Sequence, residues 1–83
     1  MMVLLALTPE KELFNGEIQS VKVPGTTGQF EILNGHAPIV AALGEGEVRI
    51  LDESGNKSTF NIKKGFVEVI NNEVSLLIQS LAE

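Results

Sequence analysis

An 83-residue chain with a net charge of −5 and no cysteine is expected to form a single domain over residues 1–83, with no disulfide to stabilise it. Its six Lys and Arg residues are scattered along the sequence, which argues against a basic surface for nucleic acid and against a polybasic contact with an anionic membrane. A negative charge of this size mainly confers solubility.

The first element expected along the chain is a short strand at Val3–Leu7. This apolar run is too short to span a bilayer, and it lacks the cationic start and small-residue cleavage site of a signal peptide. We therefore expect no direct insertion into the bilayer and a cytoplasmic location. Glu10, Glu12 and Glu17 follow in a polar region and are interpreted as a solvated face.

A glycine-rich stretch, Gly25–Gly28, comes next. No Lys-Ser or Lys-Thr pair follows it and no helix is expected after it, so the features of a phosphate-binding loop are missing. The stretch is interpreted as a loop between two strands.

The stretch Gly28–Val40 stands out, because apolar residues at Phe30 and Ile32 precede a tight Asn-Gly turn. The proline that follows restricts Ala37 to extended conformations, so this backbone is expected to be stiff. Two interpretations stay open. The loop presents apolar side chains to a partner, or these residues belong to the core and His36 only caps a turn.

Apolar and polar residues then alternate with the period of a half-buried strand, at Val48 and Ile50 and again at Phe60 and Ile62. Between them, Asp52–Lys57 predicts a hairpin turn whose glycine supplies a positive φ. Turn residues recur along the whole chain and leave little room for a long helix. The pattern is typical of an all-β sandwich or barrel of many short strands.

A second hairpin is predicted from Phe66–Ile70, an Asn71-Asn72 turn and Val74–Ile78. The last segment also fits a helical face, but the β-rich run and the turn before it favour a strand. The alternation predicts a set of side chains that point into the core: Phe60, Ile62, Val67, Val69, Val74, Leu76 and Ile78.

The sequence contains no group of residues that matches a catalytic site or a metal site. His36 is the single histidine, and Glu31, five residues earlier, gives weak support for a metal site. Scattered hydroxyl and carboxylate groups supply no nucleophile with a base and an orienting residue. We therefore expect no catalytic residue, no metal and no cofactor.

Five pieces of the sequence, in order, resemble the epsilon chain of F-type ATP synthases, which is the delta chain in mitochondria. They begin with Thr8–Glu10 followed by Leu13–Glu17, and with Val21–Gly25. The most specific piece reads GQFEILNGHAP, from Gly28 to Pro38. The pieces that follow are Leu43, Gly46, Val48 and Ile50, and then Gly65–Val69 with Asn72 and Val74.

Three departures from the family pattern are evident. Glu31 stands where many relatives have glycine, and Lys64 replaces the first glycine of a usual pair. Full-length relatives also continue into a C-terminal helical hairpin that can inhibit hydrolysis and in some cases bind ATP. Those roles are not carried over, so no nucleotide is expected to bind.

The resemblance implies a flattened sandwich of two antiparallel sheets with about ten short strands. It implies a non-catalytic subunit of the central stalk that links the gamma subunit to the membrane ring of c subunits and couples proton translocation to ATP synthesis. Its place would be the cytoplasmic side of the bacterial inner membrane.

The residues implied to face the c-ring are Gln29, Phe30, Glu31 and Ile32, and those implied to face gamma are His36, Ala37, Ile39, Val40 and Ala42. The alternative is a free-standing β-sandwich binding module, for instance one for carbohydrate. The chain has no Trp and no Tyr to stack on sugars, which disfavours that alternative.

Overall fold

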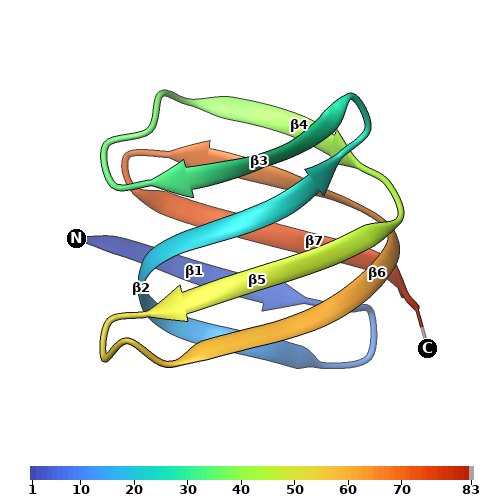
Figure 1. The fold of residues 1–83 in the computed structure, drawn as a ribbon, viewed down its shortest axis with the longest axis horizontal. Helices are drawn as coiled ribbons and strands as arrows, with labels where there is room; N and C mark the ends of the chain where they lie inside the picture. The colour runs from blue at the N-terminus through green and yellow to red at the C-terminus, as the bar shows by residue number, and fades with distance from the viewer. Residues whose placement is uncertain (83) are drawn as a thin grey trace.

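The computed structural model describes residues 1–82, which contain no helix and seven strands. The first four strands are β1 (Met2–Leu7), β2 (Glu12–Gly25), β3 (Gly28–Leu33) and β4 (Ile39–Leu43). The other three are β5 (Gly46–Asp52), β6 (Lys57–Ile70) and β7 (Glu73–Leu81). Figure 1 shows them folded over one another in two layers, with β3 and β4 at the top of the view.

The strands hydrogen-bond into one continuous sheet that closes on itself. β1 pairs with β2, β2 with β5, β5 with β6, β6 with β7, and β7 returns to β1. The two long strands make this closure possible. β2 pairs with β1 through its first half and with β3 and β5 through its second, while β6 pairs first with β5 and then with β4 and β7.

This arrangement differs from the expected sandwich in two respects. The structure has seven strands where about ten short ones were expected, because β2 and β6 each run for 14 residues without interruption. The hydrogen bonding does not divide into two separate antiparallel sheets, since the long strands continue from one layer to the other. The β1–β7 pair is moreover parallel.

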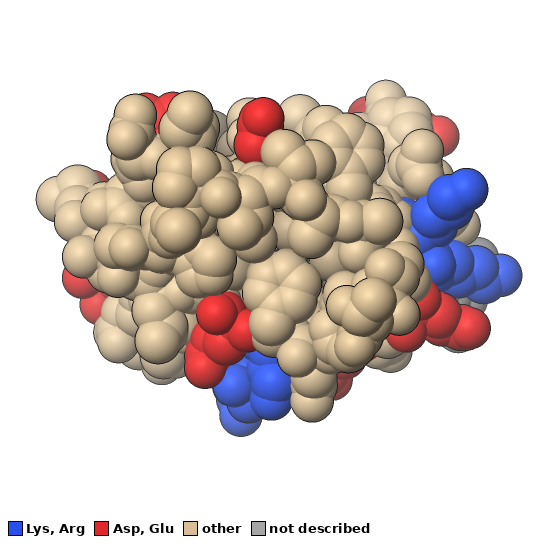
Figure 2. Space-filling model, turned by 90° about the horizontal axis from the view of Figure 1, so that it is seen from above, with Lys and Arg blue, Asp and Glu red and all other residues tan. Residues whose placement is uncertain are grey.

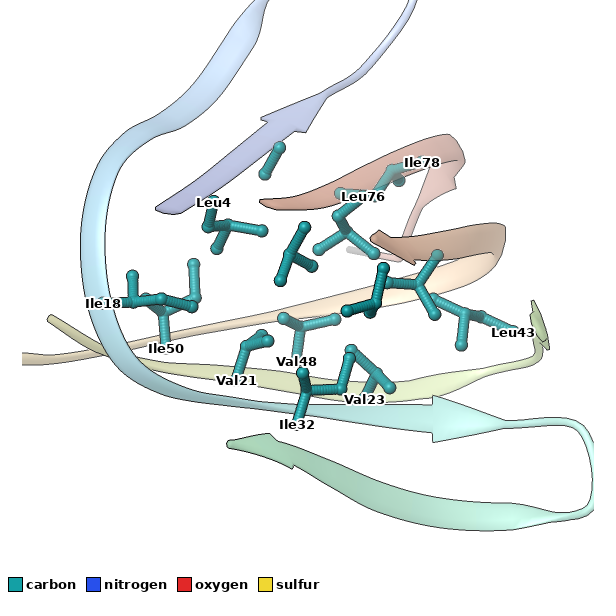
Figure 3. Packing of buried hydrophobic residues seen from close by; sticks show 14 of the residues in the cluster. Leu4, Ile18, Val21, Val23, Ile32, Leu43, Val48, Ile50, Leu76 and Ile78 are labelled. Carbon is teal, nitrogen blue, oxygen red and sulfur yellow. The ribbon is translucent and has the colours of Figure 1, made fainter. Parts of the chain in front are cut away.

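The core lies between the two layers (Figure 3), with side chains of β1 and β7 facing those of β2, β3 and β5. Six of the seven predicted core residues are buried, and Phe60 packs against them half-buried. The register predicted for both hairpins is therefore confirmed. The last segment is a strand, so the helical alternative is wrong.

The turns adopt the backbone that their residues predict. Gly55 has φ 90° in the β5–β6 hairpin, and Asn71 and Asn72 have φ 49° and 61° between β6 and β7, as a two-residue hairpin loop requires. Lys64 is exposed with no positive φ, so it replaces glycine without strain. Its neighbour Gly65 must stay glycine, because a Cβ there would lie 2.5 Å from the carbonyl oxygen of Leu77.

Candidate partner-binding surface

The outer face formed by β1, β7, β6 and β4 carries an unbroken row of apolar side chains. Strand register places Leu7 beside Leu77, Leu77 beside Phe66, and Phe66 beside Ala42. We call these four residues the apolar row. Phe66 remains 38% exposed although it is a large hydrophobic residue, and a contiguous apolar surface on a small domain is a candidate interaction site.

Two depressions adjoin the apolar row. One of about 310 Å³ is lined by Leu7, Pro9, Phe66 and Leu77, among others. The second, of about 280 Å³, lies beside Val40 of β4, which is 69% exposed. Both depressions are shallow, so they fit side chains of a docked macromolecule better than an enclosed small ligand.

The opposite outer face, formed by β3, β2, β5 and the first half of β6, is mainly polar, although Leu33 on β3 is 54% exposed. Register places Glu31, Lys22 and Arg49 side by side across three strands. The Arg49 Nη2 atom lies 3.8 Å from Oε2 of Glu31, and both side chains are more than a third exposed. An ion pair so exposed contributes about 0–1 kcal/mol to stability. The two faces of the molecule thus differ in chemistry.

Three of the four residues expected on the c-ring side reach the surface. Gln29 and Glu31 are exposed on β3, and Phe30 is half-buried against the core. The fourth assignment is wrong for the side chain, because Ile32 is 0% exposed and belongs to the core. The pleat decides this, since neighbouring residues of a strand point to opposite faces. Glu31 has no positive φ, so it fits where relatives have glycine.

The residues expected on the gamma side fall into two groups. Val40 and Ala42 are exposed on β4 and join the outer face of the apolar row, whereas Ile39 is half-buried and turned toward the core. His36 and Ala37 lie in the connection between β3 and β4, where Nδ1 of His36 is 2.7 Å from the carbonyl oxygen of Ala37. That contact agrees with a histidine that caps a turn.

Sequence reasoning missed four further apolar residues on this face: Phe66, Ile70, Leu77 and Leu7. A signal for them was present. In the predicted strand Phe66–Ile70, the inward positions are apolar, and Phe66 and Ile70 make two of the outward positions apolar as well. Whether these residues form a continuous surface depends on which strands are neighbours in the sheet. The period-2 pattern of a single strand carries no information on strand order.

Within residues 1–82 no three His, Cys, Asp or Glu side chains are grouped so as to hold a metal ion. No helix that could cross a membrane occurs in this part of the chain. The ring of the only histidine, His36, contacts the backbone carbonyl oxygen of Ala37 and not an acidic side chain.

These features define a small closed β domain with one apolar and one mainly polar outer face. The family described as ATP synthase, Delta/Epsilon chain, beta-sandwich domain matches residues 1–83, and the chain belongs to this family. The ATP synthase epsilon chain of Chlorobaculum tepidum is 45% identical over 76 residues, which are 92% of this chain and 86% of the relative. That of Protochlamydia amoebophila is 38% identical and longer, since the match covers 94% of this chain and 53% of the relative.

Solved structures show the same fold. A chain in the mitochondrial ATP synthase of Euglena gracilis superposes with a TM-score of 0.88 at 20% identity, covering 98% of this chain and 52% of that one. A chain in the central stalk and c-ring of the Tetrahymena thermophila enzyme gives a TM-score of 0.80, also at 20% identity. The predicted membership is confirmed: this is an epsilon-type, non-catalytic chain of ATP synthase, and the free-standing module is not favoured.

Proposed function

We propose that the chain links the gamma subunit of an F-type ATP synthase to the ring of c subunits, so that proton flow through the ring is coupled to ATP synthesis. In this role it is a peripheral part of the complex on the cytoplasmic side of a bacterial inner membrane. It takes no part in the chemistry and binds no nucleotide. The observation that carries the proposal is the apolar row, which crosses four strands on one outer face.

The gamma subunit is assigned to the apolar face. Burial of Phe66, Val40 and Ile70, which are 38%, 69% and 52% exposed in the chain alone, would supply the hydrophobic stabilisation of the contact. Ala42 lets a partner approach closely between them. His36 and Ala37 lie in the connection that leads into β4 and border this contact.

The c-ring is assigned to the β3 end of the molecule, through Gln29, Phe30 and the exposed carboxylate of Glu31. Because Glu31 already lies beside Arg49 within the chain, a basic group on the ring would exchange one exposed ion pair for another. The net energy of such an exchange is small. We infer that Glu31 orients this contact, and that the apolar row supplies most of the affinity.

The experiment that tests the proposal is ATP-driven proton uptake into vesicles that contain the synthase with and without this chain, at matched hydrolysis rates. Removal of the chain is expected to leave hydrolysis in the catalytic head but to lower uptake, and addition of the chain is expected to restore it. A domain that holds two rotating parts together prevents slippage between them. Equal uptake in both preparations would refute the proposal.

A matched pair of variants locates the contact. Phe66→Glu should fail to restore uptake, because it places an unpaired charge in an apolar interface. Thr59→Glu makes the same charge change on the polar face of the same strand, where Thr59 is exposed, and should restore uptake fully. Val40→Glu is a second test of the apolar face, since this largely exposed position can change without loss of the fold.

A further inference from the structure

Although the sheet closes on itself, two of its strands have an edge with few or no hydrogen bonds to a neighbouring strand. Among the strands of residues 1–82, β1, β2, β5, β6 and β7 have hydrogen-bonded neighbours along both edges. β3 pairs only with β2, and β4 pairs with β6 along one edge while its other edge meets β2 at the single pair Gly25–Leu43. Seen from the side on which β3 and β4 lie, the surface is mostly uncharged, with charged side chains mainly toward its margins (Figure 2).

The backbone of β4 shows which groups are free. The N–H of Thr26 donates to the carbonyl oxygen of Ala42 at 3.1 Å, so Ala42 turns its backbone groups away from β6. In an antiparallel pair these directions alternate along the strand. The N–H and C=O of Val40, two residues earlier, therefore also point away from β6, and the β2–β4 ladder does not reach them.

The side chains of β4 do not protect this edge. Natural proteins shield exposed edges with charged residues, proline or bulges, but Ile39–Leu43 contains none of these and only Pro38 precedes it. The free edge of β3 is better protected, because the charged Glu31 lies on it beside Arg49. Free backbone groups and uncharged side chains on one strand edge match one kind of occupant, an extended polypeptide segment.

We propose that the partner docks by adding a strand to the free edge of β4, with main-chain hydrogen bonds to Val40 and to the N–H of Ala42. Main-chain bonds would fix the register of the contact, and alternate side chains of the added strand would pack beside the exposed side chain of Val40 on the outer face. The inference rests on the proposed function in that the partner is the gamma subunit. Its new content is the mode of binding.

Amide hydrogen exchange of the full chain, alone and saturated with gamma, tests this mode. In the free chain the amides of Val40 and Ala42 should exchange fast and that of Ala41, which faces β6, slowly. Gamma should slow the first two by at least about tenfold, as expected for backbone groups that become paired. Unchanged exchange at Val40 and Ala42 in a complex that does form overturns the strand-addition mode and leaves the proposed function intact.

Two variants separate backbone from side-chain contact. Val40→Pro removes an outward N–H, which an edge strand tolerates, and should weaken gamma binding by about fivefold or more. Val40→Ala keeps that N–H and should weaken it less. Equal losses would overturn the proposal, as would slowed exchange in the chain alone, which would make a second copy the occupant. Failure of the unaltered chain to bind gamma overturns the proposed function together with this inference.

Discussion

At the scale of single residues, the pleat of β3 separates surface from core in the most distinctive part of the sequence. Gln29 and Glu31 face solvent, while Ile32 between the layers is 0% exposed. A charge placed at Ile32 would therefore unfold the domain instead of testing a partner contact. The residues that do test it are on the outer positions of β4 and β6.

Ile62 provides the clearest test of the core. It is 0% exposed on β6, and truncation would leave a cavity between the two layers. We expect Ile62→Ala to lower the free energy of unfolding by about 2–5 kcal/mol, measured by chemical denaturation. The neighbouring Lys63 is exposed, and Lys63→Ala should change stability by less than about 0.5 kcal/mol. Similar effects at both positions would contradict the register.

At the scale of elements, local signals in the sequence predicted the two hairpins. They could not predict which strands distant in the sequence pair with each other. Asn71-Asn72 and Gly55 predicted their turns because these residues accept a positive φ. The parallel pairing of β1 with β7 joins strands from opposite ends of the chain. No local signal in the sequence predicts this pairing. The continuity of β2 through 14 residues was not predicted either, because the turn residues that recur along the chain favoured many short strands.

The β6–β7 turn also holds the connection between β3 and β4 in place. The N–H of Gly35 donates to Oδ1 of Asn72 at 2.7 Å. Asn72→Gly keeps the positive φ of the turn and removes this acceptor. We expect faster exchange of the Gly35 amide, with a change in the free energy of unfolding of less than about 1.5 kcal/mol.

Asn71→Gly is the matched control for that bond, because it makes the same chemical change in the same turn and leaves the acceptor in place. Exchange at Gly35 should then stay as in the unaltered chain. Faster exchange in both variants would show that the turn as a whole, and not Asn72 Oδ1, orders the connection that carries His36.

At the scale of the whole molecule, closure of the sheet gives two faces of different chemistry. One face carries Glu31, Lys22 and Arg49, and the other carries the apolar row. Composition and motifs were enough to predict an all-β fold and the family. They could not predict the apolar row, because its members come from four strands and meet only through the order of those strands in the sheet.

This asymmetry predicts a dependence of self-association on pH. At pH 7 the net charge of −5 makes copies of the chain repel one another, which opposes contact between their apolar faces. Protonation of carboxylates lowers that charge toward zero as the pH approaches the isoelectric point near 4.7, so the repulsion fades while the apolar attraction remains. Sedimentation velocity should find monomers at pH 7 and larger species near pH 4.7.

Phe66→Asn leaves the charge unaltered but interrupts the apolar row, and should reduce this association. Equal association of the variant and the unaltered chain near pH 4.7 would show that some other surface, the free edge of β4 first among them, brings the copies together.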